Sequence, residues 1–167
     1  MYKVLVSDNI AQKGIDILKE AGMEVDFKPE QSREEFLETI ADYDGVIVRS
    51  MTLLDEEALN KAKNLKVIGR AGTGYDNINL DEATKHGIFV FNTPTGNTIS
   101  AVEHTMGMML SLSRNIPQAN QALHNDIWDR KKYMGVEVKG KTLGIIGLGR
   151  IGSRVAKRAQ SFGMKVI

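Results

Sequence analysis

The sequence has no cysteine, and only 3 of its 167 residues are proline. Without cysteine the chain can form no disulfide, no thiolate nucleophile and no cysteine-ligated zinc site. No apolar run approaches the roughly 18–20 residues of a membrane-spanning helix, and the N-terminal residues turn acidic at Asp8, too early for a secretory signal. We therefore expect a cytoplasmic protein with no membrane partner.

The sequence also lacks an overall excess of charge, since its formal net charge is +1. The charges are nevertheless unevenly distributed. Residues 1–127 carry 12 Lys and Arg against 19 Asp and Glu, whereas residues 128–167 carry 10 against 2. A basic segment can bind nucleic acid, but here the basic residues follow a helical spacing and are not clustered with aromatic residues. We expect no nucleic acid partner; a phosphate-handling region or a chain cut before its acidic complement would explain the asymmetry.

Short apolar runs alternate with amphipathic stretches over the first 92 residues. The runs predict strands at residues 4–6, 23–27, 46–48, 65–69 and 88–91. The stretches between them have helical spacing, and Ser32 followed three positions later by Glu35 predicts a capping box. Strands that are apolar almost throughout are typical of a parallel sheet covered on both faces. The sequence therefore predicts an α/β fold, a flavodoxin-like doubly wound parallel sheet, over residues 1–94.

A second part, residues 95–167, follows a polar segment that contains Pro94 and Gly96. Residues 100–114 predict a long helix that is apolar nearly all round, so it must be buried on more than one side, at a domain junction or a subunit interface. Pro117 is expected to interrupt the helical pattern, which then resumes up to Trp128. A strand at 141–146, a helix at 150–162 and a strand at 164–167 open a Rossmann domain that these residues leave incomplete.

The hexapeptide G-L-G-R-I-G begins at Gly147, directly after a predicted strand and at the start of a predicted helix. In this context Gly147 allows the tight turn, Gly149 lets a pyrophosphate approach the backbone, and Gly152 allows close packing of helix and strand. The N–H groups near Arg150 and Ile151 would face the phosphates. The alternative is a plain strand–helix turn. The acidic residue that separates NAD from NADP would lie beyond the last residue.

A second glycine-rich segment, residues 69–77, follows the predicted fourth strand. Its N–H groups can form an anion-binding nest at the edge where open α/β sheets bind ligands. Arg49 and Ser50 end the third strand on the same edge, so Arg49 is a candidate clamp for a carboxylate or a phosphate. A structural turn and a surface ion pair are the respective alternatives. The histidines have no metal-ligand spacing, and we expect no metal site.

The order of these motifs resembles the NAD-dependent D-2-hydroxyacid dehydrogenases. The resemblance rests on V-R-S at residues 48–50, on residues 69–77 and 92–97, and on residues 140–152. Residues 128–135 and the loop at 70–74 are most similar to the branch that acts on 3-phosphoglycerate rather than to glyoxylate reductases or lactate dehydrogenases. The resemblance implies that residues 1–94 form the substrate domain and that residues 95–167 form a hinge helix and the start of an NAD-binding domain.

The resemblance also implies an activity, an oxidation of 3-phosphoglycerate to 3-phosphohydroxypyruvate by hydride transfer to NAD in serine biosynthesis. It implies a homodimer formed through residues 100–128. The residues expected to bind substrate are Arg49, Ser50, Arg70, Ala71, Gly72, Gly74 and, in a neighbouring subunit's site, Arg130. Those expected to bind the cofactor are Thr73, Gly147, Gly149, Arg150, Ile151 and Gly152.

No catalytic residue is expected within these 167 residues. The family's catalytic Arg and its His acid/base with a supporting Glu lie downstream of the cofactor motif, so we expect the 167 residues alone to be inactive. Two alternatives stay open. One is a dehydrogenase of another D-2-hydroxy acid, and the other is a non-catalytic NAD(H)-binding module similar to the family's corepressors.

Overall fold

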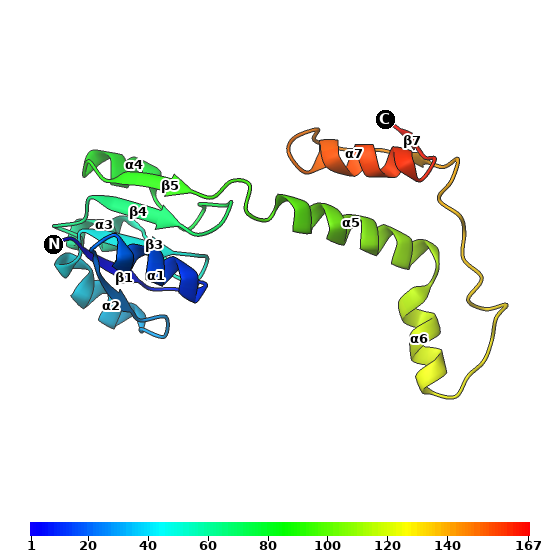
Figure 1. Ribbon diagram of the computed structural model, residues 1–167, viewed down its shortest axis with the longest axis horizontal. Coiled ribbons are helices and arrows are strands. Elements are labelled where there is room, and N and C mark those ends of the chain that lie inside the picture. The colour runs from blue at the N-terminus through cyan, green and yellow to red at the C-terminus, as the bar shows by residue number, and fades with distance from the viewer. The chain divides into compact units, whose positions relative to one another are not determined.

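The computed structural model describes all 167 residues, which divide into two compact units, Met1–Gly96 and Asn97–Ile167. Figure 1 follows the chain from blue at the N-terminus to red at the C-terminus. None of its helices combines the length and the apolar character that crossing a membrane requires.

The first unit is built on a parallel sheet with the order β2-β1-β3-β4-β5. Its strands are β1 (Lys3–Val6), β2 (Glu24–Phe27), β3 (Gly45–Val48), β4 (Val67–Arg70) and β5 (Phe89–Asn92). The chain moves outward in one direction from β1 to β2 and in the opposite direction from β3 onward. This is the flavodoxin-like order, so the predicted fold class is confirmed.

Helices cover both faces of this sheet (Figure 1). They are α1 (Gln12–Glu20), α2 (Arg33–Thr39) with the 3₁₀ turn η1 (Ile40–Asp42), α3 (Glu56–Lys61) and α4 (Leu80–Lys85). On one face, α2, α3 and α4 enclose a single core with the strands, in which Leu5 and Ile68 are fully buried. On the other face α1 packs beside β2 and its Ile15 is buried, whereas Phe89 and Phe91 of β5 are 68% and 49% exposed.

Three helices of this unit, α2, α3 and α4, begin at polar caps. Ser32 Oγ accepts from the Glu35 N–H at 3.2 Å, and the Glu35 carboxylate accepts from the Ser32 N–H at 2.9 Å, so the predicted capping box is confirmed. The Asp55 carboxylate caps α3 at the Ala58 N–H, 3.0 Å away. Asn79 Oδ1 caps α4 in the same way. These caps satisfy N–H groups that have no partner within their own helix.

The second unit contains three helices and a two-stranded parallel ladder. Its elements are α5 (Thr98–Ser113), α6 (Ile116–His124), β6 (Thr142–Leu143), α7 (Gly152–Ser161) and β7 (Lys165–Val166). Its core cluster of buried residues is small, consisting of Val102, Met106 and Val155. The unit therefore has much less buried apolar surface to stabilise it than the first unit.

The helical pattern is interrupted near Pro117, as expected, since α5 ends at Ser113 and α6 begins at Ile116. Pro117 itself lies in the first turn of α6, where its missing N–H leaves no hydrogen bond unmade. Two other expectations for this unit need correction. The helix α6 ends at His124 and does not reach Trp128. The strand expected over residues 141–146 is limited to Thr142–Leu143, since its pairing with the last residues of the chain ends where Ile145 N–H donates to the Ile167 carbonyl.

Candidate functional site

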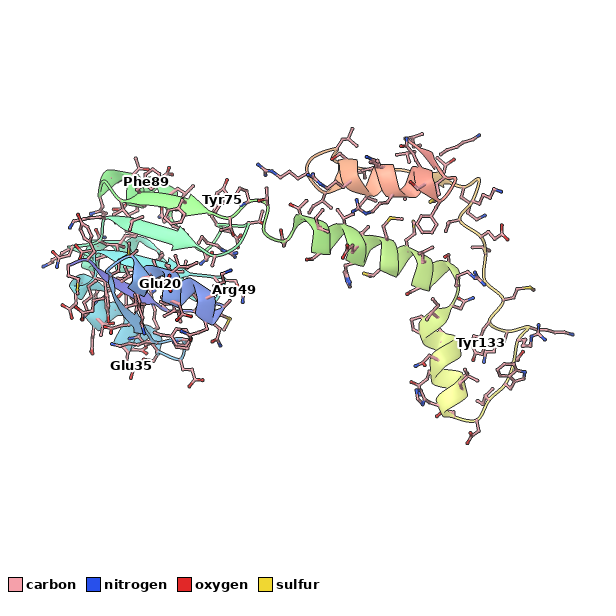
Figure 2. The ribbon with its side chains drawn as sticks, in the orientation of Figure 1. Glu20, Glu35, Arg49, Tyr75, Phe89 and Tyr133 are labelled. Atoms are coloured by element: carbon pink, nitrogen blue, oxygen red, sulfur yellow. The ribbon has the colours of Figure 1, made fainter.

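The loops after β3 and β4 lie together at the carboxyl edge of the sheet in the first unit. The Ala71 N–H donates to the Val48 carbonyl at 2.8 Å, and Asn77 Nδ2 donates to the Arg49 carbonyl at 2.8 Å. Figure 2 shows Arg49 and Tyr75 at this edge. Ligands of open α/β sheets bind at this edge, near the point where the strand order reverses.

Arg49 and Ser50 are exposed at the end of β3. Arg49 forms no ion pair; its Nη1 donates to the Asn9 carbonyl at 3.3 Å. The remaining guanidinium donors are therefore available to an anionic group, for which the planar guanidinium is well suited.

The Arg70–Gly74 loop turns tightly after β4. A Cβ added to Gly72 would lie 1.7 Å from Arg70 Nη1, so the guanidinium of Arg70 packs directly against the Gly72 backbone. Arg70 Nε is buried without a hydrogen-bond partner. Ala71 is half-buried and Gly74 is exposed. The structure thus brings the second candidate arginine to the glycine loop itself.

Thr73 lies in this same loop, beside the end of β5. Its carbonyl accepts from Asn92 Nδ2 at 2.7 Å, and its hydroxyl donates to the Thr93 carbonyl at 3.5 Å. These bonds fix the loop to the neighbouring strand. Of the candidate cofactor residues, Thr73 belongs to the first unit and the others to the second.

The second glycine loop connects β6 to α7. A hollow of about 380 Å³ lies beside it, lined by residues that include Gly147, Ile151 and Gly152. Gly147 has a φ of 92°, which favours glycine. A Cβ on Gly152 would lie 2.1 Å from the Gly147 carbonyl oxygen, so no side chain fits where helix and loop meet. A Cβ on Gly149 would meet nothing within 4 Å.

These features fit the pyrophosphate of a dinucleotide. The backbone at Gly149 is open to a ligand, and the exposed Arg150 lies just before the N-terminus of α7, a helix of 10 residues. A helix N-terminus presents unpaired N–H groups and a partial positive charge to an anion.

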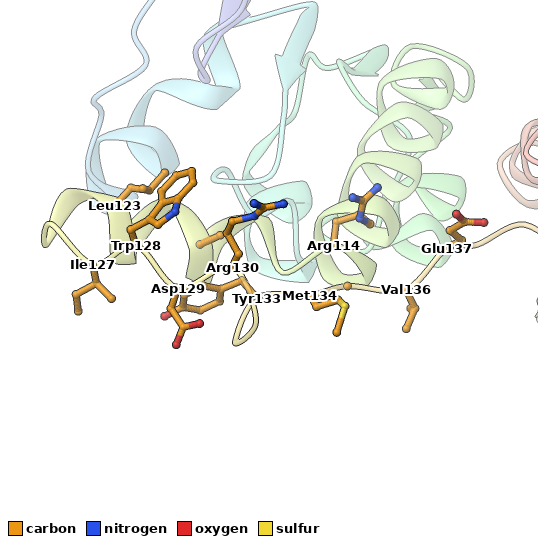
Figure 3. Close-up of a pocket in the computed structure, with 12 residues that line it drawn as sticks. Arg114, Leu123, Ile127, Trp128, Asp129, Arg130, Tyr133, Met134, Val136 and Glu137 are labelled. Carbon is orange, nitrogen blue, oxygen red and sulfur yellow. The ribbon is translucent and has the colours of Figure 1, made fainter.

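Arg130 belongs to the second unit, in the segment between α6 and β6. It lines a cleft of about 450 Å³ together with Arg114, Trp128 and Tyr133 (Figure 3). Arg130 is exposed, and Trp128 is 75% exposed. The candidate substrate residues therefore fall into two groups, Arg130 in the second unit and the others in the first.

Sequence reasoning missed three residues that hold the Arg49 loop: Asp8, Thr52 and Asn77. Asp8 is 3% exposed and Asn77 is 9% exposed. The position of Asp8 could have indicated this support from the sequence, because it is an acidic residue just beyond a buried apolar strand. Because buried carboxylates need hydrogen-bond donors, its position at the carboxyl edge predicts a loop folded around it.

Comparison with known proteins identifies the family. The model of the D-isomer specific 2-hydroxyacid dehydrogenase catalytic domain matches residues 4–162. The chain belongs to this family. The resemblance inferred from the motifs is therefore confirmed.

Relatives within the family share the name D-3-phosphoglycerate dehydrogenase. The protein from Archaeoglobus fulgidus is 48% identical over 165 residues, covering 99% of this chain and 31% of its own length. The Homo sapiens protein is 51% identical over 167 residues, covering 100% and 31%. The solved NAD+-bound 3-phosphoglycerate dehydrogenase of Entamoeba histolytica has a TM-score of 0.78 and 35% identity, covering 99% of this chain and 51% of that one. The chain thus spans about a third of the length of these curated relatives.

Proposed function

We propose that the protein is an NAD-dependent dehydrogenase that oxidises 3-phosphoglycerate to 3-phosphohydroxypyruvate, a step of serine biosynthesis, in the cytoplasm. The observation that carries this proposal is the pair Arg49 and Arg70 at one sheet edge, neither of which forms an ion pair within the protein. A substrate with both a carboxylate and a phosphate needs two such cationic groups. The names of the curated relatives support the same substrate.

The residues of the first unit would bind and orient the substrate. Arg49 and Arg70 would pair with its anionic groups, and the Ser50 hydroxyl would form a hydrogen bond with one of its oxygens. Ala71, Gly72 and Gly74 would line the site, where the N–H groups of Ala71 and Gly72 already donate to the Val48 and Arg70 carbonyls. Arg130 would serve the site of a second subunit. Holding the substrate in one orientation lowers the entropy cost of the reaction.

The glycine loop of the second unit would hold the cofactor. Gly147, Gly149, Arg150, Ile151 and Gly152 would surround its pyrophosphate, and Thr73 would lie toward its nicotinamide end. When bound, NAD supplies the acceptor for the hydride that leaves C2 of the substrate. The proton of the C2 hydroxyl needs a base, which we place outside these 167 residues, so the chain alone would bind ligands without turning them over.

Turnover of the full-length protein tests the proposal. We expect NADH oxidation with 3-phosphohydroxypyruvate to be faster, by at least about tenfold in kcat/KM, than with hydroxypyruvate, which lacks the phosphate, because one charge-assisted contact is lost. Equal rates would favour a dehydrogenase of another D-2-hydroxy acid. Binding of NADH without turnover of either compound would favour the corepressor-like module.

A variant of Arg49 tests the role of the sheet edge. Arg49→Ala should raise the KM for 3-phosphohydroxypyruvate by about tenfold or more, since a charged hydrogen-bond partner is removed. Lys19→Ala, on the exposed surface of α1, is the matched loss of a positive charge and should leave the KM unchanged. Equal effects of the two variants would exclude a specific role for Arg49.

We further propose that the protein forms a homodimer through residues 100–128. In the single chain this region exposes large apolar side chains that a soluble surface rarely gathers: Met108 at 60%, Leu112 at 77%, Leu123 at 53% and Trp128 at 75%. Sedimentation of the full-length protein should show a dimer that Leu112→Glu weakens, whereas Ile17→Glu on α1 should not weaken it. An unchanged dimer in Leu112→Glu would place the interface elsewhere.

A further inference from the structure

Asp8 is a buried carboxylate without a cationic partner. It lies two residues after the end of β1 and is 3% exposed, and it takes part in none of the ion pairs of the structure. Its hydrogen-bond donors all come from one loop, the segment Arg49–Thr52 after β3. Because β1 and β3 are neighbours in the sheet, the end of β1 lies beside the start of this loop.

The loop surrounds the carboxylate with N–H groups. Oδ2 of Asp8 accepts from the N–H groups of Arg49, of Met51 at 3.3 Å and of Thr52 at 3.4 Å. Oδ1 accepts from the Thr52 hydroxyl at 3.0 Å. Hydrogen bonds to an ionised acceptor are stronger than neutral ones, and several convergent N–H groups define one backbone conformation.

Asn77 holds the same loop through its carbonyl groups. Its Nδ2 donates to the carbonyls of Arg49 at 2.8 Å and Thr52 at 2.7 Å. Carbonyls only accept, so the amide nitrogen must face them, and Asn77 Oδ1 stays buried without a partner. Asp8 therefore holds the N–H groups of this loop, and Asn77 holds its carbonyl groups.

We propose that Asp8 is a positioning residue for substrate binding. It acts through Arg49: its carboxylate fixes the backbone from which the Arg49 side chain extends, so that the guanidinium is held in place before the substrate's anionic group arrives. Asp8 itself touches no substrate, because its two oxygens are occupied by the loop. This inference rests on the proposed function, since it requires that Arg49 binds the substrate.

The test uses steady-state kinetics of the full-length protein with NADH and 3-phosphohydroxypyruvate. Asp8→Ala removes the acceptors and should raise the substrate KM between about tenfold and a hundredfold, the range expected when a binding group is misplaced by about 1 Å. Asp8→Asn keeps one acceptor for the N–H groups and should recover most of the loss. The KM for NADH should not change in either variant. Asp16→Ala, an exposed aspartate on α1, is the matched control.

A double-variant cycle distinguishes positioning from general stability. In an Arg49→Ala background, Asp8→Ala should add less than about twofold to the KM, because the group that Asp8 positions is already absent. If Asp8→Ala fails to fold, Thr52→Val replaces it. This change keeps the shape of the side chain and removes the hydroxyl that contacts Asp8 at 3.0 Å and Ser7 Oγ at 2.9 Å, while the backbone donors to Asp8 remain. It should raise the KM severalfold only when Arg49 is present.

Four kinds of result would overturn the inference. If the fold-increases in substrate KM of Asp8→Ala and Arg49→Ala multiply fully in the double variant, Asp8 does not act through Arg49. A change in the NADH KM as large as that in the substrate KM would indicate a loss of structure. Failure of the unmodified protein to turn over 3-phosphohydroxypyruvate, or no effect of Arg49→Ala, would overturn the proposed function and this inference with it. An Asp8 variant without effect beside an impaired Arg49→Ala would overturn the inference alone.

Discussion

Gly149 and Gly152 lie three positions apart in one loop, yet adding a methyl group to each should have opposite effects. In Gly152→Ala the new Cβ would lie 2.1 Å from the Gly147 carbonyl oxygen and 3.1 Å from Ile145 Cγ2. Cβ atoms essentially never approach other heavy atoms closer than 3.0 Å. The carbonyl or the start of α7 must therefore move by about 1 Å to accept the methyl group.

The cost of this movement follows from overpacking. Forcing an extra methyl group into a packed contact costs about 1–3 kcal/mol, and here the contact is backbone, which cannot turn away as a side chain can. The core of the second unit offers little to compensate, since its buried cluster consists of Val102, Met106 and Val155. We expect Gly152→Ala to lower the free energy of unfolding of this unit by about 1–3 kcal/mol.

Gly149→Ala is the matched variant. Its Cβ meets nothing within 4 Å, and its φ is not positive, so the free energy of unfolding should change by less than about 0.5 kcal/mol. The same methyl group would stand where a pyrophosphate has to approach the backbone. It should therefore weaken NADH binding by about tenfold or more, the equivalent of one lost backbone contact to an anion.

Two assays separate the variants. Urea unfolding of the 167-residue chain, followed by the circular dichroism of its helices, reports on the free energy of unfolding. Titration of the full-length protein with NADH reports on the cofactor site. If Gly152→Ala unfolds at the wild-type urea concentration, the close contact is not the reason for glycine there. If Gly149→Ala binds NADH normally, the loop does not hold the pyrophosphate as proposed.

Three further substitutions concern the first unit, each measured by urea unfolding. The hydrogen bond from the Tyr43 hydroxyl to Asp26, 2.8 Å long, is the main cause that holds the pKa of Asp26 below its usual value. When the pKa of a carboxylate is lowered in the folded state, the resulting stabilisation is present above the unfolded-state pKa and is lost as the pH falls through the folded-state pKa. Tyr43→Phe should therefore lower the free energy of unfolding by about 1 kcal/mol at pH 7, discounted for the partly exposed Asp26, and by clearly less at pH 3. An equal decrease at both pH values would refute the linkage. Ile68→Ala should lower the free energy of unfolding by about 2–5 kcal/mol because the Ile68 side chain is fully buried. Ile17→Ala, at a residue that is 55% exposed, should lower it by less than about 0.5 kcal/mol, and similar decreases would contradict the core assignment. Asn79→Ala should lower the free energy of unfolding by about 0.5–2 kcal/mol, because the cap of α4 is lost. Asn79→Asp keeps a capping oxygen and should retain most of that free energy, whereas an equally unstable Asn79→Asp would exclude capping as the cause.

The sheet of the first unit was predictable because its signals are local. The runs at residues 4–6 and 46–48 are apolar throughout, as expected of central strands covered on both faces, and Ser32 with Glu35 marked a helix start. The glycine motif at Gly147 was likewise recognisable from its spacing. Each of these signals lies within a few residues of the feature that it predicts.

The support of the Arg49 loop was not predictable in this way. Asp8 and the Arg49 N–H that it accepts from are 41 positions apart, and their meeting depends on the parallel register of β1 with β3. The same holds for Asn77, which reaches Arg49 across 28 positions. The break near Pro117 was predictable, but the first residue of α6 was not, because a proline excluded from a helix interior is accepted in a first turn.

The burial of Asp8 restricts the conformation of the Arg49–Thr52 loop. A carboxylate taken out of water costs several kcal/mol unless donors replace the water, and all the donors that replace it here belong to the Arg49–Thr52 segment. The loop cannot leave its conformation without leaving this charge unsatisfied, nor without freeing the two carbonyls that Asn77 holds. The backbone that carries Arg49 is therefore fixed before any ligand binds. Affinity for an anion at this edge then pays no ordering cost for the loop, and only the exposed guanidinium of Arg49 has to lose conformational freedom.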